Sequence, residues 1–301
     1  FLLQSDVGTD MSPEECITAL ETQLKDTIKD ISSLTTQNKD LYTEYLSAVP
    51  TLSKPKEIME QLKDDSLVDF PEIKNISYEL KNVPNALSGT SACAFYLVPP
   101  IDSKDANIIY INNNRVESNE MFSTLAHEGY PGHLYQTVWF HNHCSSDLRK
   151  ILSFSGYTEG WAAYVEALSY RLDNGLDPLL GELLEANSKA TLGIHAYLDL
   201  AVNYLGWERK DVQKYLASYF SDPESVVDSM FETMVDNPAN YLSYFIGSLE
   251  ICNMRETAEL QLGDSFNATA FHTFLLDMGN APFDVIQSYF TTWLMNQKMR
   301  K

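Results

Sequence analysis

A segment near the middle of the chain combines ionisable residues on a half-buried helix with a helix breaker. Over residues 121–128 the apolar side chains recur at helical spacing, so His127 and Glu128 lie on a partly buried helical face. Pro131 and Gly132 follow within a turn; proline removes a helical hydrogen bond and glycine permits unusual dihedral angles. The fold must therefore accommodate a helix break directly beside buried groups that need partners.

The spacing of histidines around this break indicates a metal site. In the usual zinc-peptidase pattern, two histidines four residues apart face one metal, and the glutamate beside the first activates water. Here His133 follows His127 by six residues, which is roughly 240° around a regular α-helix. His133 can reach the same Zn²⁺ only if Pro131 and Gly132 distort the helix. The alternative interpretation is that His133 caps a broken helix.

A third ligand is expected from a separate helix. Glu159 and Glu166 are seven residues apart, so they share one helical face among aromatic and small residues. We expect Glu159 to bind the metal, and Glu166 to orient a ligand or to substitute for Glu159. The alternative for Glu159 is a first-turn glutamate that the helix dipole stabilises.

The remaining pattern predicts a mainly α fold in one domain, residues 1–301. Ser12, Pro13 and Glu15 form a helix-start signal, and this helix should run to about Ser33. Residues 76–112 contain the convincing strand signals, at 76–80 and 108–111. The other expected helices span 37–48, 54–63, 118–130, 133–142, 147–153, 158–174, 178–203, 208–219, 224–235, 240–262, 267–278 and 282–296.

Charge and composition exclude several classes of partner. The formal charge is −21, with 42 acidic residues against 21 Lys and Arg, which argues against nucleic acid and anionic membranes as partners. The four cysteines are far apart and indicate neither a disulfide scaffold nor a zinc ribbon. No stretch approaches the ~20 apolar residues of a membrane-spanning helix. The abrupt apolar start of the chain suggests a fragment of something longer.

At these motifs the sequence resembles the bacterial domain-of-unknown-function 885 (DUF885) family. That family has a His-Glu-x-x-Pro-Gly-His segment followed by a Glu-Gly-Trp-Ala-x-Tyr-x-Glu helix, which appear here as HEGYPGH at 127–133 and EGWAAYVE at 159–166. The resemblance continues through most of the chain. The family looks like a distant relative of the zincin carboxypeptidases, which implies a zincin-like helical domain with a small β segment before the active-site helix. Members are about twice this length, so the chain would be a C-terminal half whose partner is the missing N-terminal half.

One departure from the family pattern concerns a histidine. Where members often carry Asp-x-Gly-x-His, this chain has Asp199 and then Asn203 in the place of the histidine. Asparagine donates hydrogen bonds but does not shuttle protons near neutral pH. His195, two turns earlier, is a possible replacement, although a lone helical histidine is more often packed or solvated.

The predicted mechanism assigns a role to each remaining candidate. Zinc lowers the pKa of a bound water to about 7, and Glu128 takes its proton and passes it to the leaving amine. Tyr244, with Tyr241 one turn before it, would stabilise the oxyanion, the alternative being two core tyrosines. Arg255 would clamp a substrate carboxylate or form an ordinary salt bridge. His272 would orient a carboxylate or simply pack.

Three functions remain open from the sequence alone. The first is a zinc peptidase acting on short peptides, favoured by the complete set of two histidines and two glutamates. The second is a zinc hydrolase of a non-peptide amide, and the third is a catalytically inactive zincin-like binding protein. Resemblance to secreted and lipid-anchored proteins favours the bacterial cell envelope or secretion. His141 and His143 resemble a weak surface metal site more than a catalytic one.

Overall fold

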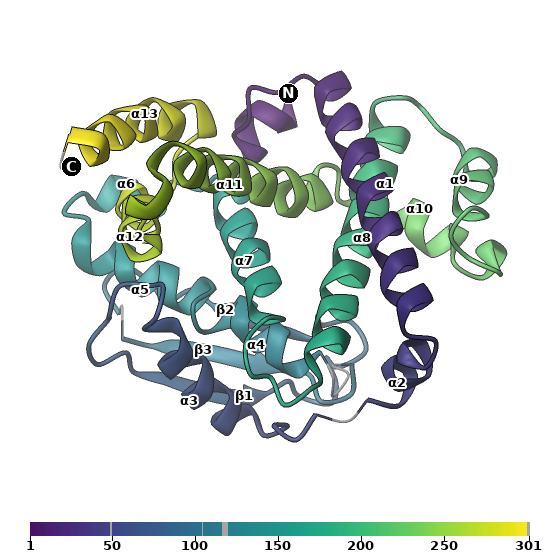
Figure 1. The fold of residues 1–301 in the computed structure, drawn as a ribbon, viewed down its shortest axis with the longest axis horizontal. Coiled ribbons are helices and arrows are strands. Elements are labelled where there is room, and N and C mark those ends of the chain that lie inside the picture. Colours follow the sequence, from purple (N-terminus) through teal and green to yellow (C-terminus); the bar gives the residue numbers. More distant parts are fainter. Residues whose placement is uncertain (49, 104, 116–119, 300–301) are drawn as a thin grey trace.

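The chain folds into helices stacked over one small sheet (Figure 1). The computed structural model describes residues 1–48, 50–103, 105–115 and 120–299. Its α-helices are α1 (Pro13–Gln37), α2 (Leu41–Ser47), α3 (Pro55–Ser66), α4 (Met121–Glu128), α5 (His133–His143), α6 (Asp147–Ile151), α7 (Ser155–Ser169), α8 (Pro178–Asn203), α9 (Arg209–Leu216), α10 (Val227–Asp236), α11 (Asn240–Leu262), α12 (Ala268–Met278) and α13 (Phe283–Met299). The strands are β1 (Tyr78–Asn82), β2 (Ala94–Leu97) and β3 (Asn107–Ile111).

These elements confirm the predicted mainly α class. The bounds of α8 and α11 match the predicted 178–203 and 240–262, and the capping box of α1 is present between Ser12 and Glu15. The helix expected from Ser118 begins at Met121 in the structure; Ser118 itself lies outside the described residues. A short π-helical turn at Leu3–Val7 was not expected. No described helix is long and apolar enough to cross a membrane.

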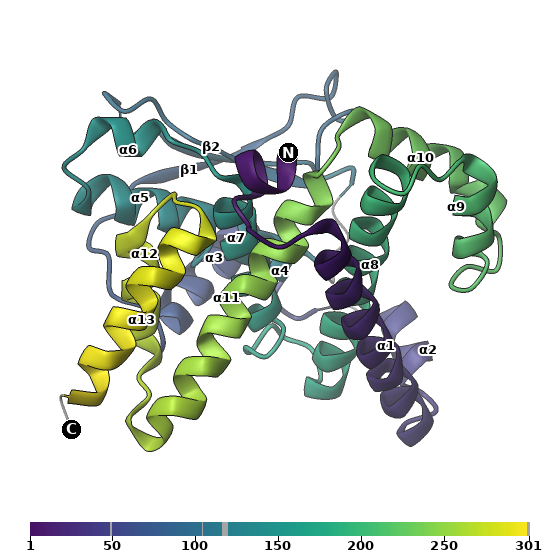
Figure 2. The same cartoon turned by 90° about the horizontal axis from the view of Figure 1, so that it is seen from above.

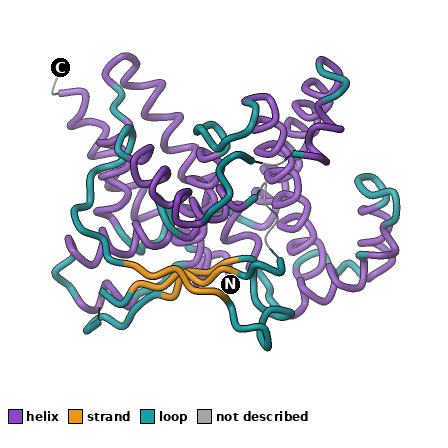
Figure 3. Tube along the Cα trace, turned by 90° about the horizontal axis from the view of Figure 1, so that it is seen from below, coloured by secondary structure: helices purple, strands orange, loops and turns teal. Residues whose placement is uncertain are grey.

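The three strands lie together on one side of the helices (Figure 3). Their order is β1-β3-β2; β1 runs parallel to β3, and β2 runs antiparallel to it. The central strand β3 buries Asn107, Ile109 and Ile111, as its alternating side chains require. The strand β2 lies within the predicted β region but was not assigned as a strand. It forms the edge of the sheet beside α4.

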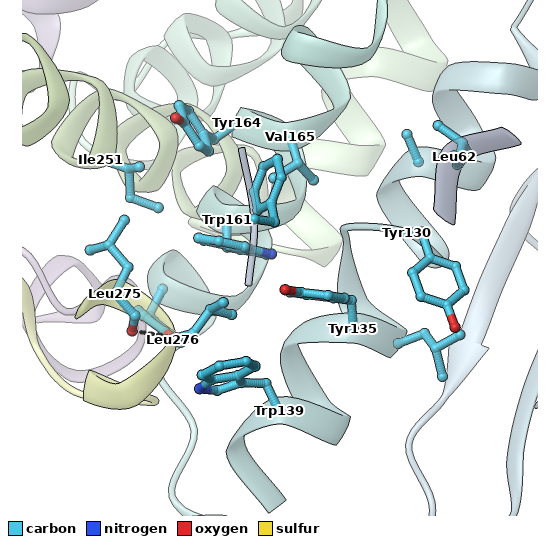
Figure 4. Packing of buried hydrophobic residues seen from close by; sticks show 14 of the residues in the cluster. Leu62, Tyr130, Tyr135, Trp139, Trp161, Tyr164, Val165, Ile251, Leu275 and Leu276 are labelled. Atoms are coloured by element: carbon cyan, nitrogen blue, oxygen red, sulfur yellow. Dashed lines mark hydrogen bonds between the residues drawn. The ribbon is translucent and has the colours of Figure 1, made fainter. Parts of the chain in front are cut away.

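The largest hydrophobic core joins α5, α7, α11 and α12 (Figure 4). Trp161 of α7 is fully buried at its centre, between Tyr135 of α5 and Leu275 of α12. The indole Nε1 of Trp161 donates to the main-chain oxygen of Pro131 at 2.9 Å. The core therefore holds α7 against the loop that separates α4 from α5.

Helices α7 and α11 cross at a contact between glycines. A Cβ atom on Gly160 would lie 2.3 Å from the carbonyl carbon of Gly247, and one on Gly247 would lie 2.0 Å from the oxygen of Gly156. Real Cβ atoms do not approach other heavy atoms this closely, so the crossing requires residues without side chains. The close approach holds α11 against α7, which itself packs on α4.

Candidate metal centre

The helix break that the sequence requires is present between Glu128 and His133. Helix α4 ends at Glu128, and α5 begins at His133. A Cβ atom on Gly132 would lie 1.8 Å from the main-chain oxygen of His127, so this turn folds directly back onto the end of α4. His133 thus returns to the side of His127 instead of lying on the far face of one continuous helix.

Three ligand groups converge at this break. Among the described residues, His127, His133 and Glu159 form the one group of three potential metal ligands, with ligand atoms within 4.8 Å of one another. Oε2 of Glu159 lies 3.6 Å from Nε2 of His127 and 3.3 Å from Nε2 of His133. Ligand atoms about 2.1 Å from a tetrahedral zinc are about 3.4 Å apart. The two separations from Glu159 are close to this value, and all three ligand atoms lie within 4.8 Å of one another.

The carboxylate of Glu159 also meets the chemical requirement of a ligand. Its Oε2 is buried, and its contacts with the imidazole nitrogens of His127 and His133 do not have hydrogen-bond geometry. Although burial raises its pKa, the neighbouring His127 and His133 lower the pKa of Glu159 far below its usual value. A buried, ionised oxygen facing two imidazole nitrogens is the arrangement that a cation satisfies.

Two further carboxylates flank His127. Oε2 of Glu166 lies 2.9 Å from Nδ1 of His127, the nitrogen opposite the one that faces Glu159. Burial lowers the pKa of His127, but Glu159, Glu166 and Glu128 together raise it well above the usual value. Glu166 therefore sets the ring orientation and directs Nε2 towards the other ligand groups.

Glu128 is held by the edge strand. Its Oε2 accepts a hydrogen bond of 2.7 Å from the main-chain nitrogen of Tyr96 in β2. This contact was missed by sequence reasoning, because a main-chain donor leaves no signal in residue type. Glu128 is buried beside His127, where one carboxylate oxygen is fixed by β2.

Tyr244 lies over the same centre. Its ring is 5.9 Å from that of His127, and the two planes are within 19° of parallel. Burial first, and then the carboxylate of Glu159, raise the pKa of Tyr244 far above its usual value. The phenol is therefore protonated at neutral pH and can donate a hydrogen bond.

Asp199 and Asn203 hold the start of α11. Oδ1 of Asp199 accepts hydrogen bonds from the main-chain nitrogen of Ala239 at 2.9 Å and from Nδ2 of Asn203 at 3.0 Å. Nδ2 of Asn203 also donates to the oxygen of Met234 at 2.9 Å. Ala239 has a left-handed φ of 70°, which this pairing supports. The structure places both residues in the packing that fixes the helix bearing Tyr244.

Tyr241 and His195 pack against each other near that helix start, with ring centroids 4.7 Å apart. Nδ1 of His195 is bonded to the oxygen of Thr191 at 2.8 Å. His143 bonds the oxygen of Trp139 and stacks on its ring. His195 and His143 are thus engaged with α8 and α5, outside the group of three potential ligands.

Arg255 and His272 meet at Tyr164. Nη1 of Arg255 donates to the phenol oxygen of Tyr164 at 2.7 Å, and its Nε pairs with Glu259 at 2.7 Å. Burial lowers the pKa of His272 to about 3, so its ring is neutral. Nδ1 of His272 then donates to the oxygen of Asp69 at 2.7 Å, and Nε2 accepts from Tyr164 at 2.8 Å. Sequence reasoning missed Tyr164, although it lies within the EGWAAYVE motif.

The sequence of the chain matches a known protein family. The model described as "Bacterial protein of unknown function (DUF885)" matches residues 1–289, nearly the whole chain. The chain belongs to the DUF885 family. The resemblance inferred from HEGYPGH and EGWAAYVE is therefore confirmed. A comparison with curated proteins gave no match.

Two solved structures share the fold of this DUF885 chain. One, a "putative lipoprotein" from Colwellia psychrerythraea, is similar with a TM-score of 0.83 and 20% identity over 98% of this chain and 54% of its own. The other, a "putative lipoprotein of unknown function" from Shewanella oneidensis, gives 0.70 and 16% over 96% of this chain and 58% of its own. The chain thus spans a little over half the length of these proteins.

Proposed function

We propose that this chain is a zinc-dependent peptidase that hydrolyses short peptides. The observation that carries the proposal is the convergence of His127, His133 and Glu159. Oε2 of Glu159 lies 3.6 Å and 3.3 Å from the two imidazole nitrogens, close to the ~3.4 Å between ligand atoms around a tetrahedral zinc. The buried Oε2 of Glu159, which faces both imidazoles without hydrogen-bond geometry, supports the same assignment. Three protein ligands leave one coordination position open, as in catalytic rather than structural zinc sites. Bound Zn²⁺ would supply Lewis acidity and an activated water at neutral pH.

Glu128 is proposed as the general base. It follows His127 in sequence and is buried at the same helix end. Because the amide of Tyr96 holds Oε2, the orientation of the carboxylate is fixed, and Oε1 is the oxygen proposed to take a proton from water. The same oxygen can then deliver the proton to the leaving amine.

Tyr244 is proposed as the donor to the developing oxyanion. Its protonated phenol lies against the ring of His127 and beside Glu159. A fixed hydrogen-bond donor beside the metal ligands stabilises negative charge as it forms on the carbonyl oxygen of the substrate. Asp199 and Asn203 contribute indirectly, because they hold the first turn of the helix that carries Tyr244.

We further propose the bacterial cell envelope as the location. The solved structures of similar fold are described as putative lipoproteins, and proteins of that kind are anchored through a lipid instead of a spanning helix.

Metal analysis tests the foundation of the proposal. The purified chain should hold zinc at near-equal stoichiometry, and His127→Ala should lose it. Zinc absent from the wild type, or retained unchanged in His127→Ala, would remove the proposed ligand set.

A second measurement separates an enzyme from a binding protein. Glu128→Gln should keep zinc but lose cleavage of a peptide library, because the amide takes no proton. Equal cleavage by both proteins would exclude Glu128 as the base. Cleavage of non-peptide amides alone would instead identify a different amide hydrolase.

A further inference from the structure

A long groove runs between α1 and α8 on one side and α7 and α11 on the other. It consists of a larger cavity of about 1170 Å³ and a smaller one of about 240 Å³. The two share lining residues from three helices: Gln23, Glu185, Lys189, Leu249 and Asn253. They are therefore two parts of one groove. The helices α1 and α11 diverge towards one end (Figure 2).

The inner end of this groove leads towards the candidate metal centre. Glu166 lines the smaller cavity, and its carboxylate also contacts Nδ1 of His127. Ala163, which also lines it, is one turn after Glu159 on the same face of α7, about 6 Å along the axis. Ser248 bears the same relation to Tyr244 on α11. The side chain of Glu159 is 26% exposed, so the centre is accessible to solvent.

The lining is strongly acidic. The larger cavity carries six carboxylates, namely Glu14, Glu15, Asp26, Asp30, Glu182 and Glu185, and the smaller adds Glu166 and Glu256. Arg171 and Lys189 are the cations in the same lining, and both bind the buried Glu185. Eight carboxylates against two cations exceed the 42 to 21 ratio of the whole chain.

Three of these carboxylates are free to meet a ligand. Asp26 and Asp30 on α1 and Glu182 on α8 are exposed, and none forms an ion pair or hydrogen bond through its side chain with another described residue. They line the outer part of the groove, whereas Glu185 in its floor is already neutralised. Arg171 interacts electrostatically with Glu182, whereas Asp26 and Asp30 have no ion pair with a described cation, so the excess negative charge lies in the larger cavity.

We propose that this groove binds the substrate and selects peptides that carry basic side chains. The inference rests on the proposed peptidase function and adds the substrate class to it. The volume of the groove accommodates several residues of a peptide on one side of the candidate metal centre. Lysine and arginine side chains of such a peptide would meet carboxylates along α1 and α8, and the attraction would weaken as salt screens it.

The experiment measures peptide binding apart from cleavage. The zinc-loaded Glu128→Gln chain is titrated with a fluorescent octapeptide containing two lysines and with its counterpart containing two glutamines. The groove variant combines Asp26→Asn, Asp30→Asn and Glu182→Gln. A matched control combines Glu224→Gln, Asp236→Asn and Asp264→Asn, which remove the same charge from exposed positions outside the groove.

The groove variant should raise the Kd of the lysine peptide about tenfold and that of the glutamine peptide less than twofold, as expected for lost attraction from three nearby charges. The control variant should change both by less than twofold. Equal weakening by both variants would overturn the inference, since only net charge would then matter. Failure of the lysine peptide to bind would also overturn it and would favour this face as a contact for another part of a longer protein.

Cleavage by the chain with Glu128 intact separates the two proposals. If the wild type cleaves the lysine peptide, the groove variant should raise KM and leave kcat unchanged. If the wild type cleaves neither peptide but the groove variant still raises the Kd of the lysine peptide, the peptidase proposal fails and the groove assignment stands. If it cleaves and the groove variant changes neither KM nor Kd, the groove assignment fails alone.

Discussion

Nδ1 of His127 lies 2.9 Å from Oε2 of Glu166, a contact that joins the end of α4 to the last turn of α7. The opposite nitrogen of the same ring faces Glu159, seven residues earlier on α7. One imidazole is thus held between two carboxylates of one helical face. This is the arrangement by which proteins fix the tautomer and direction of a metal-binding histidine.

Removal of the Glu166 carboxylate should weaken zinc binding. We expect Glu166→Ala to lower zinc affinity about 10-fold to 100-fold, since the ring of His127 loses its orienting acceptor. Glu166→Gln should fall between the variant and the wild type, because its amide oxygen can still accept from Nδ1. Competition against a chromogenic chelator measures the affinities. Unchanged affinity in Glu166→Ala would mean that packing alone orients His127.

Tyr244→Phe should separate catalysis from metal binding. Loss of the phenol donor should lower kcat about 10²-fold to 10³-fold, whereas zinc content should be unchanged. Tyr289→Phe on α13, where the side chain is 60% exposed, is the matched control and should retain activity. A Tyr244→Phe enzyme with wild-type kcat would assign the tyrosine to packing.

Gly132→Ala should destabilise the fold and the metal centre together. The added Cβ would meet the main-chain oxygen of His127, which cannot rotate away. We expect a loss of about 3 kcal/mol or more in the free energy of unfolding, together with weaker zinc binding. Gly89→Ala, where a Cβ meets nothing within 4 Å, should stay within about 0.5 kcal/mol of wild type. Urea denaturation of both variants tests this.

His272 should make the stability depend on pH. Burial lowers its pKa from 6.5 to about 3. Between these two pH values the imidazole binds a proton in the unfolded chain but not in the folded protein. The contribution of the neutral ring is complete above pH 6.5 and is lost as the pH falls towards 3. Within this window, one proton changes the free energy of unfolding by about 1.4 kcal/mol per pH unit.

The measurement compares wild type with His272→Gln by urea denaturation from pH 7 to pH 4. The variant should be less stable at pH 7, because it loses bonds to Tyr164 and Asp69. Its stability should fall less steeply with decreasing pH. Parallel curves would show that His272 is protonated equally in the folded and unfolded states.

Asp199→Ala should destabilise the start of α11 without removing zinc. The substitution leaves the amide of Ala239 and the side chain of Asn203 without their acceptor, at a cost of about 2 to 3 kcal/mol. Asp64→Ala, an exposed position, is the control. Loss of zinc in correctly folded Asp199→Ala would give Asp199 a direct part in the centre.

Much of the fold follows from local signals in the sequence. The helix α8 begins at Pro178, behind an Asp177 cap, and its bounds were predicted because caps and apolar periodicity agree there. The strand β2 was not assigned, since it has only four residues and is stabilised by pairing with β3. Pairing between distant segments is a tertiary property that a local pattern does not contain.

The candidate site was predictable to the extent that side-chain chemistry defines it. The convergence of His127, His133 and Glu159 follows from residue type and from the need for a break at Gly132. The amide of Tyr96 and the glycine crossing of α7 and α11 were not predictable, because both depend on main-chain positions in the folded protein.

The break between α4 and α5 has a consequence for finding such centres in other sequences. Four residues after His127 the chain has Pro131. A search for two histidines four residues apart therefore does not find this candidate site. His133 instead belongs to a second helix, and its approach is set by the fold of the turn. A sequence pattern for such candidate centres must therefore describe two helices and the turn between them. The number of residues between the histidines then depends on the length of that turn.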